Sequence, residues 1–164
     1  GGGLTDSAFE TKKRVIQQAL DLHRPPQDDP VAVLSMVGGL DLAAMTGAFL
    51  GCAREGVAAV VDGFISAVAA LCAARLCPAA KDMMFLSHAS YEAGYRLAAD
   101  ELGLEPCLLL GMRLGEGSGC PLMFRVLQGA CTVLRDMATF AEGEIQDDYL
   151  APIRAMDAFT VENT

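Results

Sequence analysis

Apolar positions recur with helical spacing through the first third of the chain. Thr5-Asp6-Ser7 offers capping side chains. The apolar residues that follow favour a helix to about His23; they are Phe9, Val15, Ile16, Ala19, Leu20 and Leu22. A polar, proline-rich turn comes next. Two more helices are expected, one from Pro30 to about Gly38 and one, rich in small residues, from about Leu40 to Glu55.

Beyond these helices the pattern changes to strand, polar turn and helix, repeated three times. The predicted units are 57–61, 62–63 and 64–76; then 83–86, 87–90 and 91–102; then a weaker strand 107–110, a loop 111–119 and a long helix 121–140. This order is typical of an α/β protein, so we predict a three-layer, Rossmann-like parallel sheet flanked by helices. Ligands of open parallel sheets bind beyond the carboxyl ends of the strands, so the three turns are expected to form one site.

Composition restricts the classes of partner. The formal net charge is −9, which argues against a general nucleic-acid or anionic-membrane partner because such partners are held by Lys and Arg. The longest apolar region, 57–74, is interrupted by Asp62 and fits a buried strand and helix better than a membrane span. The six cysteines follow no metal-binding spacing. They indicate small core side chains in a reducing, cytoplasmic protein rather than disulfides or a metal site. The chain opens with glycines and lacks the basic-then-apolar start of a signal peptide.

The loop GMRLGEGSGC (111–120) carries four glycines around Glu116. A dinucleotide loop is a poor interpretation, because a carboxylate ~4 Å from pyrophosphate costs on the order of 4 kcal/mol at an effective dielectric near 20. The glycine spacing also differs from that of the dinucleotide fingerprint. Two interpretations stay open. Glu116 is either a general base aimed at a ligand by the flanking glycines, or a capping carboxylate for the helix that follows.

The other two turns also have two interpretations each. Ser87, His88 and Ser90 suit a phosphate site formed by hydroxyl groups and a helix start, and equally an ordinary serine cap. A catalytic Ser–His pair is not favoured, because the two residues are adjacent and no nucleophile elbow is present. Asp62 either caps a helix or binds ligand, and Arg113 either pairs with a ligand carboxylate or with Glu116.

Five blocks of sequence carry a family resemblance. They are VGGLDLAAMTGAFL (37–50), VVDGFISAVAAL (60–71), SHASYEAG (87–94), LGMRLGEGSG (110–119) and DMATF (136–140). Together, and in this order, they resemble the nicotinate-nucleotide–dimethylbenzimidazole phosphoribosyltransferases, which act in assembly of the lower nucleotide loop of cobalamin. The resemblance covers residues 1–141 and corresponds to the carboxyl-terminal part of that family. Residues 142–164 are then an acidic carboxyl-terminal extension, in which Leu150, Ile153, Met156 and Phe159 could form a short amphipathic helix.

The resemblance implies a reaction that needs neither metal nor cofactor. A ring nitrogen of 5,6-dimethylbenzimidazole attacks the anomeric carbon of nicotinate mononucleotide, nicotinate leaves, and α-ribazole 5′-phosphate forms with inversion. It assigns Glu116 as the general base, places Ser90 and the opening glycines at the phosphate, and places Arg113 and Leu114 beside the acceptor base. The complete set of expected substrate-binding residues is Gly1, Gly2, Gly3, Asp62, Gly63, Ser87, Ser90, Arg113, Leu114, Gly115 and Gly117.

The chain also departs from the family. Family members are about twice as long, and the part that precedes Gly1 in them supplies a second glycine-rich loop and much of the benzimidazole pocket. The resemblance therefore implies a homodimer that needs the amino-terminal half for a complete site. Gly1-Gly2-Gly3 stands where a GTG-like pattern is usual, and Ala89 is smaller than expected. Two alternatives remain: a non-catalytic nucleotide- or phosphate-binding module, and a structural dimerisation domain.

Overall fold

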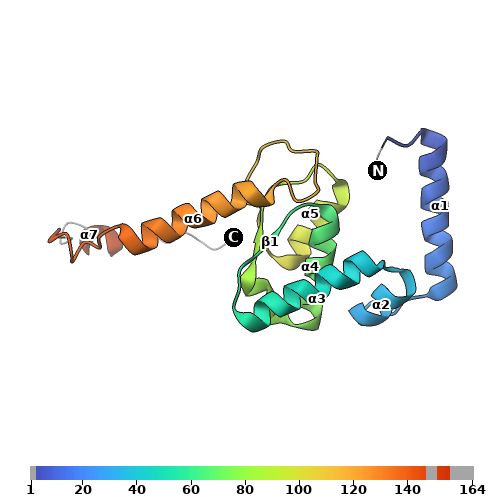
Figure 1. Ribbon diagram of the computed structural model, residues 1–164, viewed down its shortest axis with the longest axis horizontal. Coiled ribbons are helices and arrows are strands. Elements are labelled where there is room, and N and C mark those ends of the chain that lie inside the picture. Colours follow the sequence, from blue (N-terminus) through green and yellow to red (C-terminus); the bar gives the residue numbers. More distant parts are fainter. Residues whose placement is uncertain (1–2, 147–150, 156–164) are drawn as a thin grey trace. The chain divides into compact units, whose positions relative to one another are not determined.

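A computed structural model describes residues 3–146 and 151–155 (Figure 1). The chain divides into two compact units, Gly1–Arg125 and Val126–Thr164. The first unit contains most of the helices and both strands, and the second begins within a long helix. The predicted boundary between residues 141 and 142 marks where the family resemblance ends, whereas the division into units reflects how compactly the chain is folded. The predicted boundary therefore stays a prediction.

The three amino-terminal helices are confirmed: α1 (Asp6–His23), α2 (Pro30–Val37) and α3 (Leu40–Glu55). Their ends follow from local chemistry. The Thr5 side chain caps α1 by accepting the Ala8 N–H, and the Asp29 carboxylate caps α2 by accepting two N–H groups at 3.0 Å each. Gly56 closes α3 in the left-handed conformation, with φ 66°.

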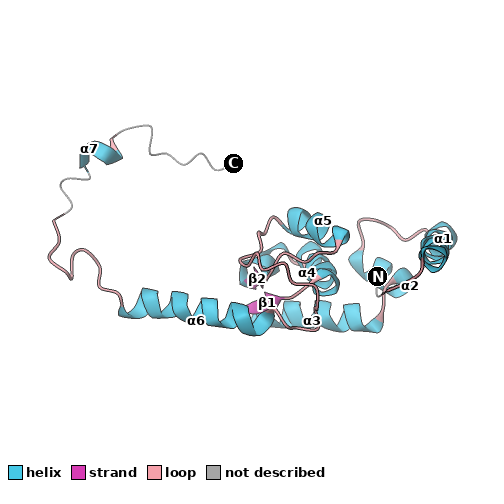
Figure 2. Cartoon of the chain, turned by 90° about the horizontal axis from the view of Figure 1, so that it is seen from above, coloured by secondary structure: helices cyan, strands magenta, loops and turns pink. Residues whose placement is uncertain are grey.

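A small parallel sheet follows (Figure 2). Strand β1 (Ala59–Val61) pairs with β2 (Met84–Leu86), with Val60 opposite Phe85. Helix α4 (Phe64–Leu76) connects them, as predicted, together with a 3-10 helix, η1 (Pro78–Met83), which the sequence analysis did not anticipate. Helix α5 (Ala93–Leu102) follows β2 and begins two residues later than expected.

The predicted third strand, 107–110, is wrong for the described residues. Only Leu108 makes a parallel bridge, to His88, which lies beyond the end of β2. A strand needs a backbone partner along its length, and Leu109 and Leu110 remain largely exposed instead. The described part of the chain is therefore mostly helical around a two-stranded parallel sheet.

Alanines of α4 form the centre of the core. Four of them, Ala67, Ala69, Ala70 and Ala73, are completely buried where α4 packs against α3 and α5. Small side chains allow this close approach: a Cβ at Gly94 of α5 would lie 2.6 Å from Cε2 of Phe64 on α4. The cysteines that the sequence analysis expected in the core are half-buried or exposed instead. The alanine core fixes the strand ends from which the site is built.

The remaining elements are α6 (Cys120–Asp136) and α7 (Ala151–Arg154). Helix α6 begins directly after the glycine loop, as predicted, and ends before the expected Phe140. Of the residues proposed for a terminal amphipathic helix, Ile153 lies in α7, whereas Leu150, Met156 and Phe159 lie outside the described residues. No helix within residues 3–146 and 151–155 is long and apolar enough to cross a membrane.

Candidate active site

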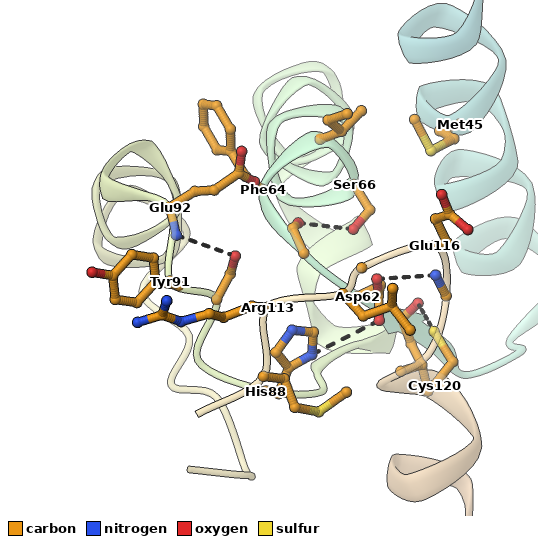
Figure 3. Close-up of a pocket in the computed structure, with 18 of the residues that line it drawn as sticks. Met45, Asp62, Phe64, Ser66, His88, Tyr91, Glu92, Arg113, Glu116 and Cys120 are labelled. Atoms are coloured by element: carbon orange, nitrogen blue, oxygen red, sulfur yellow. Dashed lines mark hydrogen bonds and ion pairs between the residues drawn. The ribbon is translucent and has the colours of Figure 1, made fainter. Parts of the chain in front are cut away.

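A cavity of about 820 Å³ opens where β1 and β2 end, within the first unit (Figure 3). All three turns that follow the predicted strands contribute to its wall, together with Met45 and Phe49 of α3 and the first residues of α4. The lining includes eight of the predicted site residues: Asp62, Gly63, Ser90, Arg113, Leu114, Gly115, Glu116 and Gly117. The convergence of the three turns is thereby confirmed.

The centre of the glycine loop has an unusual backbone. Gly115, Glu116 and Gly117 all have positive φ, at 78°, 57° and 78°. Glycine adopts this conformation freely, whereas for glutamate it costs roughly 1–2 kcal/mol. The Ser118 N–H donates to the Gly115 carbonyl oxygen at 3.0 Å and closes a turn around Glu116. Figure 3 shows Glu116 on the same side of the cavity as Met45. Its side chain is exposed and makes no capping bond to α6 in the described part of the chain, so the capping interpretation loses its support.

Asp62 anchors this loop through two hydrogen bonds to its backbone. One carboxylate oxygen, Oδ2, accepts the Gly117 N–H at 3.0 Å, and the other, Oδ1, accepts the Gly119 N–H at 2.8 Å. Asp62 is 8% exposed and directly follows β1. It does not cap α4, whose N-cap Gly63 makes no side-chain bond. The structure therefore gives Asp62 a use that neither sequence interpretation foresaw.

The close approach of loop and strand requires glycine at position 119. A Cβ there would lie 2.6 Å from Oγ of Ser87 and 2.8 Å from Oδ1 of Asp62, and closer still to Nδ1 of His88. The sequence shows four glycines in the loop, but nothing in it indicates which of them packs closely against buried polar side chains. Gly119 is thus a site residue that sequence reasoning missed.

Ser87 lies behind the cavity wall, whereas its neighbour His88 contributes to the lining. Ser87 is completely buried, and its hydroxyl donates to the backbone carbonyl oxygen of Asp62 at 3.2 Å. Because that uses its only proton, Nδ1 of His88 is the donor in the 3.0 Å bond between the two side chains. Nδ1 also lies 3.8 Å from Oδ1 of Asp62. The serine supports the loop anchor, and direct contact of Ser87 with substrate stays a prediction that this buried position does not favour.

Ser90 and the start of α4 form the best anion-binding wall of the cavity. The Ser90 hydroxyl accepts only a long bond, 3.4 Å from the Glu92 N–H. A Cβ on Gly63 would meet nothing closer than this hydroxyl, at 3.9 Å, so the helix start is open. Helical geometry leaves the first N–H groups of α4 without helical acceptors, and these groups, with the helix dipole, favour an anion.

Arg113 stacks on an aromatic ring. Its guanidinium carbon lies 3.9 Å from the centroid of the Tyr91 ring, a cation–π contact at the rim of the cavity (Figure 3). Sequence analysis expected Arg113 to pair with a ligand carboxylate or with Glu116. No ion pair between Arg113 and Glu116 occurs among the described residues, and the contact with Tyr91 is one that the sequence did not predict.

Comparison with known proteins decides the family. A phosphoribosyltransferase family model matches residues 1–145. The chain belongs to this family. The matched residues include the whole cavity lining, from Met45 to Cys120.

Several relatives of this chain bear the more specific name that the resemblance suggested. A nicotinate-nucleotide–dimethylbenzimidazole phosphoribosyltransferase of Clostridium perfringens is 49% identical over 161 residues, which are 98% of this chain and 45% of the relative. One of Clostridium tetani is 45% identical over 155 residues, or 94% of this chain and 43% of the relative. The chain thus spans less than half the length of the curated relatives it matches.

Solved structures agree with the fold. The crystal structure of CobT from Thermus thermophilus superposes with a TM-score of 0.81 at 35% identity, covering 90% of this chain and 44% of that one. A second structure, of the phosphoribosyltransferase from the same organism, gives a TM-score of 0.69 at 39% identity over 74% of this chain and 36% of that one.

The opening glycines are also among the predicted site residues. Gly1 and Gly2 lie outside the described residues. Gly3 is exposed, has φ 72° and does not line the cavity. Their predicted contact with phosphate therefore stays a prediction.

Proposed function

We propose that this chain carries the Glu116-bearing part of an enzyme that transfers 5-phosphoribose from nicotinate mononucleotide to 5,6-dimethylbenzimidazole. The products are α-ribazole 5′-phosphate and nicotinate. The observation that carries the proposal is the presentation of Glu116 at the cavity by three consecutive left-handed residues, in a chain 49% identical to a relative of that name.

In the proposed reaction one bond forms and one breaks at the anomeric carbon. A ring nitrogen of the benzimidazole attacks this carbon, and the bond to the pyridinium nitrogen of nicotinate mononucleotide breaks, its electron pair leaving with nicotinate. Glu116 accepts the proton from the other ring nitrogen as the first becomes bonded. An ionised Glu116 also places negative charge near the positively charged ribose of the transition state, which lowers its free energy.

The phosphate of the nucleotide is assigned to the start of α4. The open N–H groups there and the Ser90 hydroxyl are donors, and Gly63 leaves room for close approach. This assignment separates the phosphate from Glu116, which lies on the glycine loop. Arg113 and Leu114 remain assigned to the acceptor base, since both line the cavity from the amino-terminal half of the loop.

Ser90→Ala tests the phosphate assignment. We expect weaker binding of nicotinate mononucleotide by roughly 1–3 kcal/mol, because a hydrogen bond to a charged group is lost. Isothermal titration calorimetry measures the change, with Ser35→Ala, on the exposed surface of α2, as the matched control. Equal affinity in the Ser90 variant and the parent removes Ser90 from the phosphate site.

Benzimidazole-dependent release of nicotinate tests the function as a whole. The chain is incubated with nicotinate mononucleotide, with and without dimethylbenzimidazole, and free nicotinate is separated chromatographically. Because the relatives are longer, the same assay is run on a chimera in which this chain replaces the matching 161 residues of the Clostridium perfringens enzyme. Release in either form supports the proposal. Binding without release in both forms supports a non-catalytic binding module instead.

Three further parts of the proposal concern the whole protein. We propose that the longer protein completes a three-layer, Rossmann-like fold around the parallel sheet described here, and that it acts in the cytoplasm as a homodimer whose amino-terminal half completes the benzimidazole pocket. The coverage of 44% of the Thermus thermophilus structure supports a longer fold, and the cytoplasmic homodimer rests on the resemblance to the family. Sedimentation velocity tests the dimer, and a monomer at micromolar concentration contradicts it.

A further inference from the structure

Asp62 is a buried carboxylate whose two oxygens are both used by the glycine loop. Oδ2 accepts from Gly117 and Oδ1 accepts from Gly119, at 3.0 and 2.8 Å. Bonds from N–H groups to an ionised carboxylate are about twice as strong as neutral ones. The loop is thus tied to the end of β1 by its backbone, through a contact 57 residues apart in the sequence.

The first of these bonds acts directly on the backbone of Glu116. The N–H of Gly117 belongs to the peptide group that joins Glu116 to Gly117, so the bond to Oδ2 fixes the orientation of that peptide plane. It therefore restrains the two rotations on either side of that peptide group, ψ of Glu116 and φ of Gly117, the latter at 78°. Glu116 itself has φ 57°, and a non-glycine residue leaves this conformation readily when its neighbours are not held.

The second bond and its surroundings prevent the loop from pivoting about the first. Gly119 lies against Ser87, His88 and Asp62 so closely that a Cβ would not fit. Ser87 in turn donates to the carbonyl oxygen of Asp62 and so braces the anchor itself. The backbone that follows Glu116 is therefore held at two points, the N–H groups of Gly117 and Gly119, and Asp62 binds both of them.

We propose that Asp62 is a positioning residue for Glu116, which it serves through the backbone of the glycine loop rather than by contact with substrate. The inference rests on the proposed function of Glu116 as the general base. It revises the role expected for Asp62 in substrate binding. A carboxylate already holding two N–H groups has less capacity for a substrate hydroxyl, although its edge lines the cavity.

The proposed role predicts that Asp62→Ala lowers kcat but leaves nucleotide affinity unchanged. A loose Glu116 removes the proton less efficiently, so kcat is expected to fall by about 10²-fold, the effect of a displacement of the order of 1 Å at a catalytic group. The affinity for nicotinate mononucleotide is expected to stay unchanged. Asp62→Asn keeps one acceptor oxygen and is expected to lose less than Asp62→Ala.

Two measurements distinguish this role from a merely structural one. Hydrogen exchange followed by mass spectrometry is expected to accelerate in peptides covering residues 113–120 of Asp62→Ala, with unchanged protection in α4. A double-mutant cycle with Glu116→Gln, in the chain or the chimera, is expected to show that Asp62→Ala causes little further loss once the base is gone. Asp82→Asn, an exposed carboxylate of η1, is the control.

The outcomes separate this proposal from the proposed function. Folded Asp62→Asn and Asp62→Ala variants with parent-like exchange in 113–120 overturn the anchor, whatever the turnover. So does a loss of nucleotide affinity equal to the loss of kcat, because it places Asp62 on the substrate. A third outcome is that the parent protein shows no turnover, while exchange in residues 113–120 still accelerates in the Asp62 variants. That result supports Asp62 as the anchor of the loop and rejects the role of Glu116 as general base.

Discussion

Glu116→Gln is expected to reduce turnover by about 10²- to 10⁴-fold, the contribution of a positioned general base. Glutamine has nearly the same size and fits the same loop, but its amide cannot accept the benzimidazole proton. Binding of nicotinate mononucleotide is expected to remain nearly intact, because the groups assigned to its phosphate, the start of α4 and the Ser90 hydroxyl, do not include Glu116. Initial rates of nicotinate release and calorimetric binding measure the two quantities separately.

Glu144→Gln is a matched control for this variant. Glu144 is also an exposed glutamate with positive φ, at 52°, and it does not line the cavity. The same loss of charge at the same kind of backbone position is therefore expected to leave turnover unchanged. Turnover of Glu116→Gln within a few-fold of the parent contradicts the assignment of Glu116 as the base.

Gly119→Ala is expected to destabilise the protein and to abolish most of the activity. The added methyl group would collide with buried polar atoms of Ser87, His88 and Asp62, and overpacking of this kind costs about 1–3 kcal/mol. Relief of the collision requires the loop to move off the end of β1. That movement breaks the bonds from Asp62 and displaces Glu116, so turnover is expected to fall by at least about 10²-fold.

Thermal unfolding and nicotinate release measure these two effects. The control is Gly51→Ala in α3, where a Cβ would meet nothing within 4 Å. A glycine inside a helix costs about 0.8–1.0 kcal/mol relative to alanine, so this control is expected to unfold at the same or a higher temperature. An unfolding temperature of Gly119→Ala equal to that of the parent contradicts the close packing of Gly119 against Ser87, His88 and Asp62.

The anchor also explains why a glycine-rich loop presents an anion. A phosphate loop directs its backbone N–H groups at the ligand. Here the N–H groups of Gly117 and Gly119 are directed at Asp62 instead. Their donor capacity is used within the protein, and the loop tip is left free to hold a carboxylate.

Local chemistry allowed much of the fold to be predicted from the sequence. Helix α3 begins and ends at the predicted residues because Gly39 and Gly56 flank it, and α4 follows the Asp62-Gly63 turn as expected. The convergence of the three turns followed from the parallel order of the strands. The third strand was predicted wrongly because an apolar segment becomes a strand only beside a backbone partner, and periodicity does not show whether one exists.

The parts of the site that sequence could not supply are tertiary contacts between distant residues. Asp62 reaches Gly119 across 57 positions, and Arg113 meets Tyr91 from another turn. Neither pair has a local signature. Glu116 could be singled out because its neighbours are glycines, but the side chain that holds it in place could be found only once β1 and the loop were seen together.

Formation of α-ribazole 5′-phosphate tests the central claim most directly. The chain, or the chimera that contains it, is mixed with nicotinate mononucleotide and dimethylbenzimidazole, and both products are quantified by mass spectrometry. The account predicts equimolar nicotinate and α-ribazole 5′-phosphate, with both lost in Glu116→Gln. Nicotinate accompanied only by ribose 5-phosphate, or equal product in the parent and in Glu116→Gln, would contradict it.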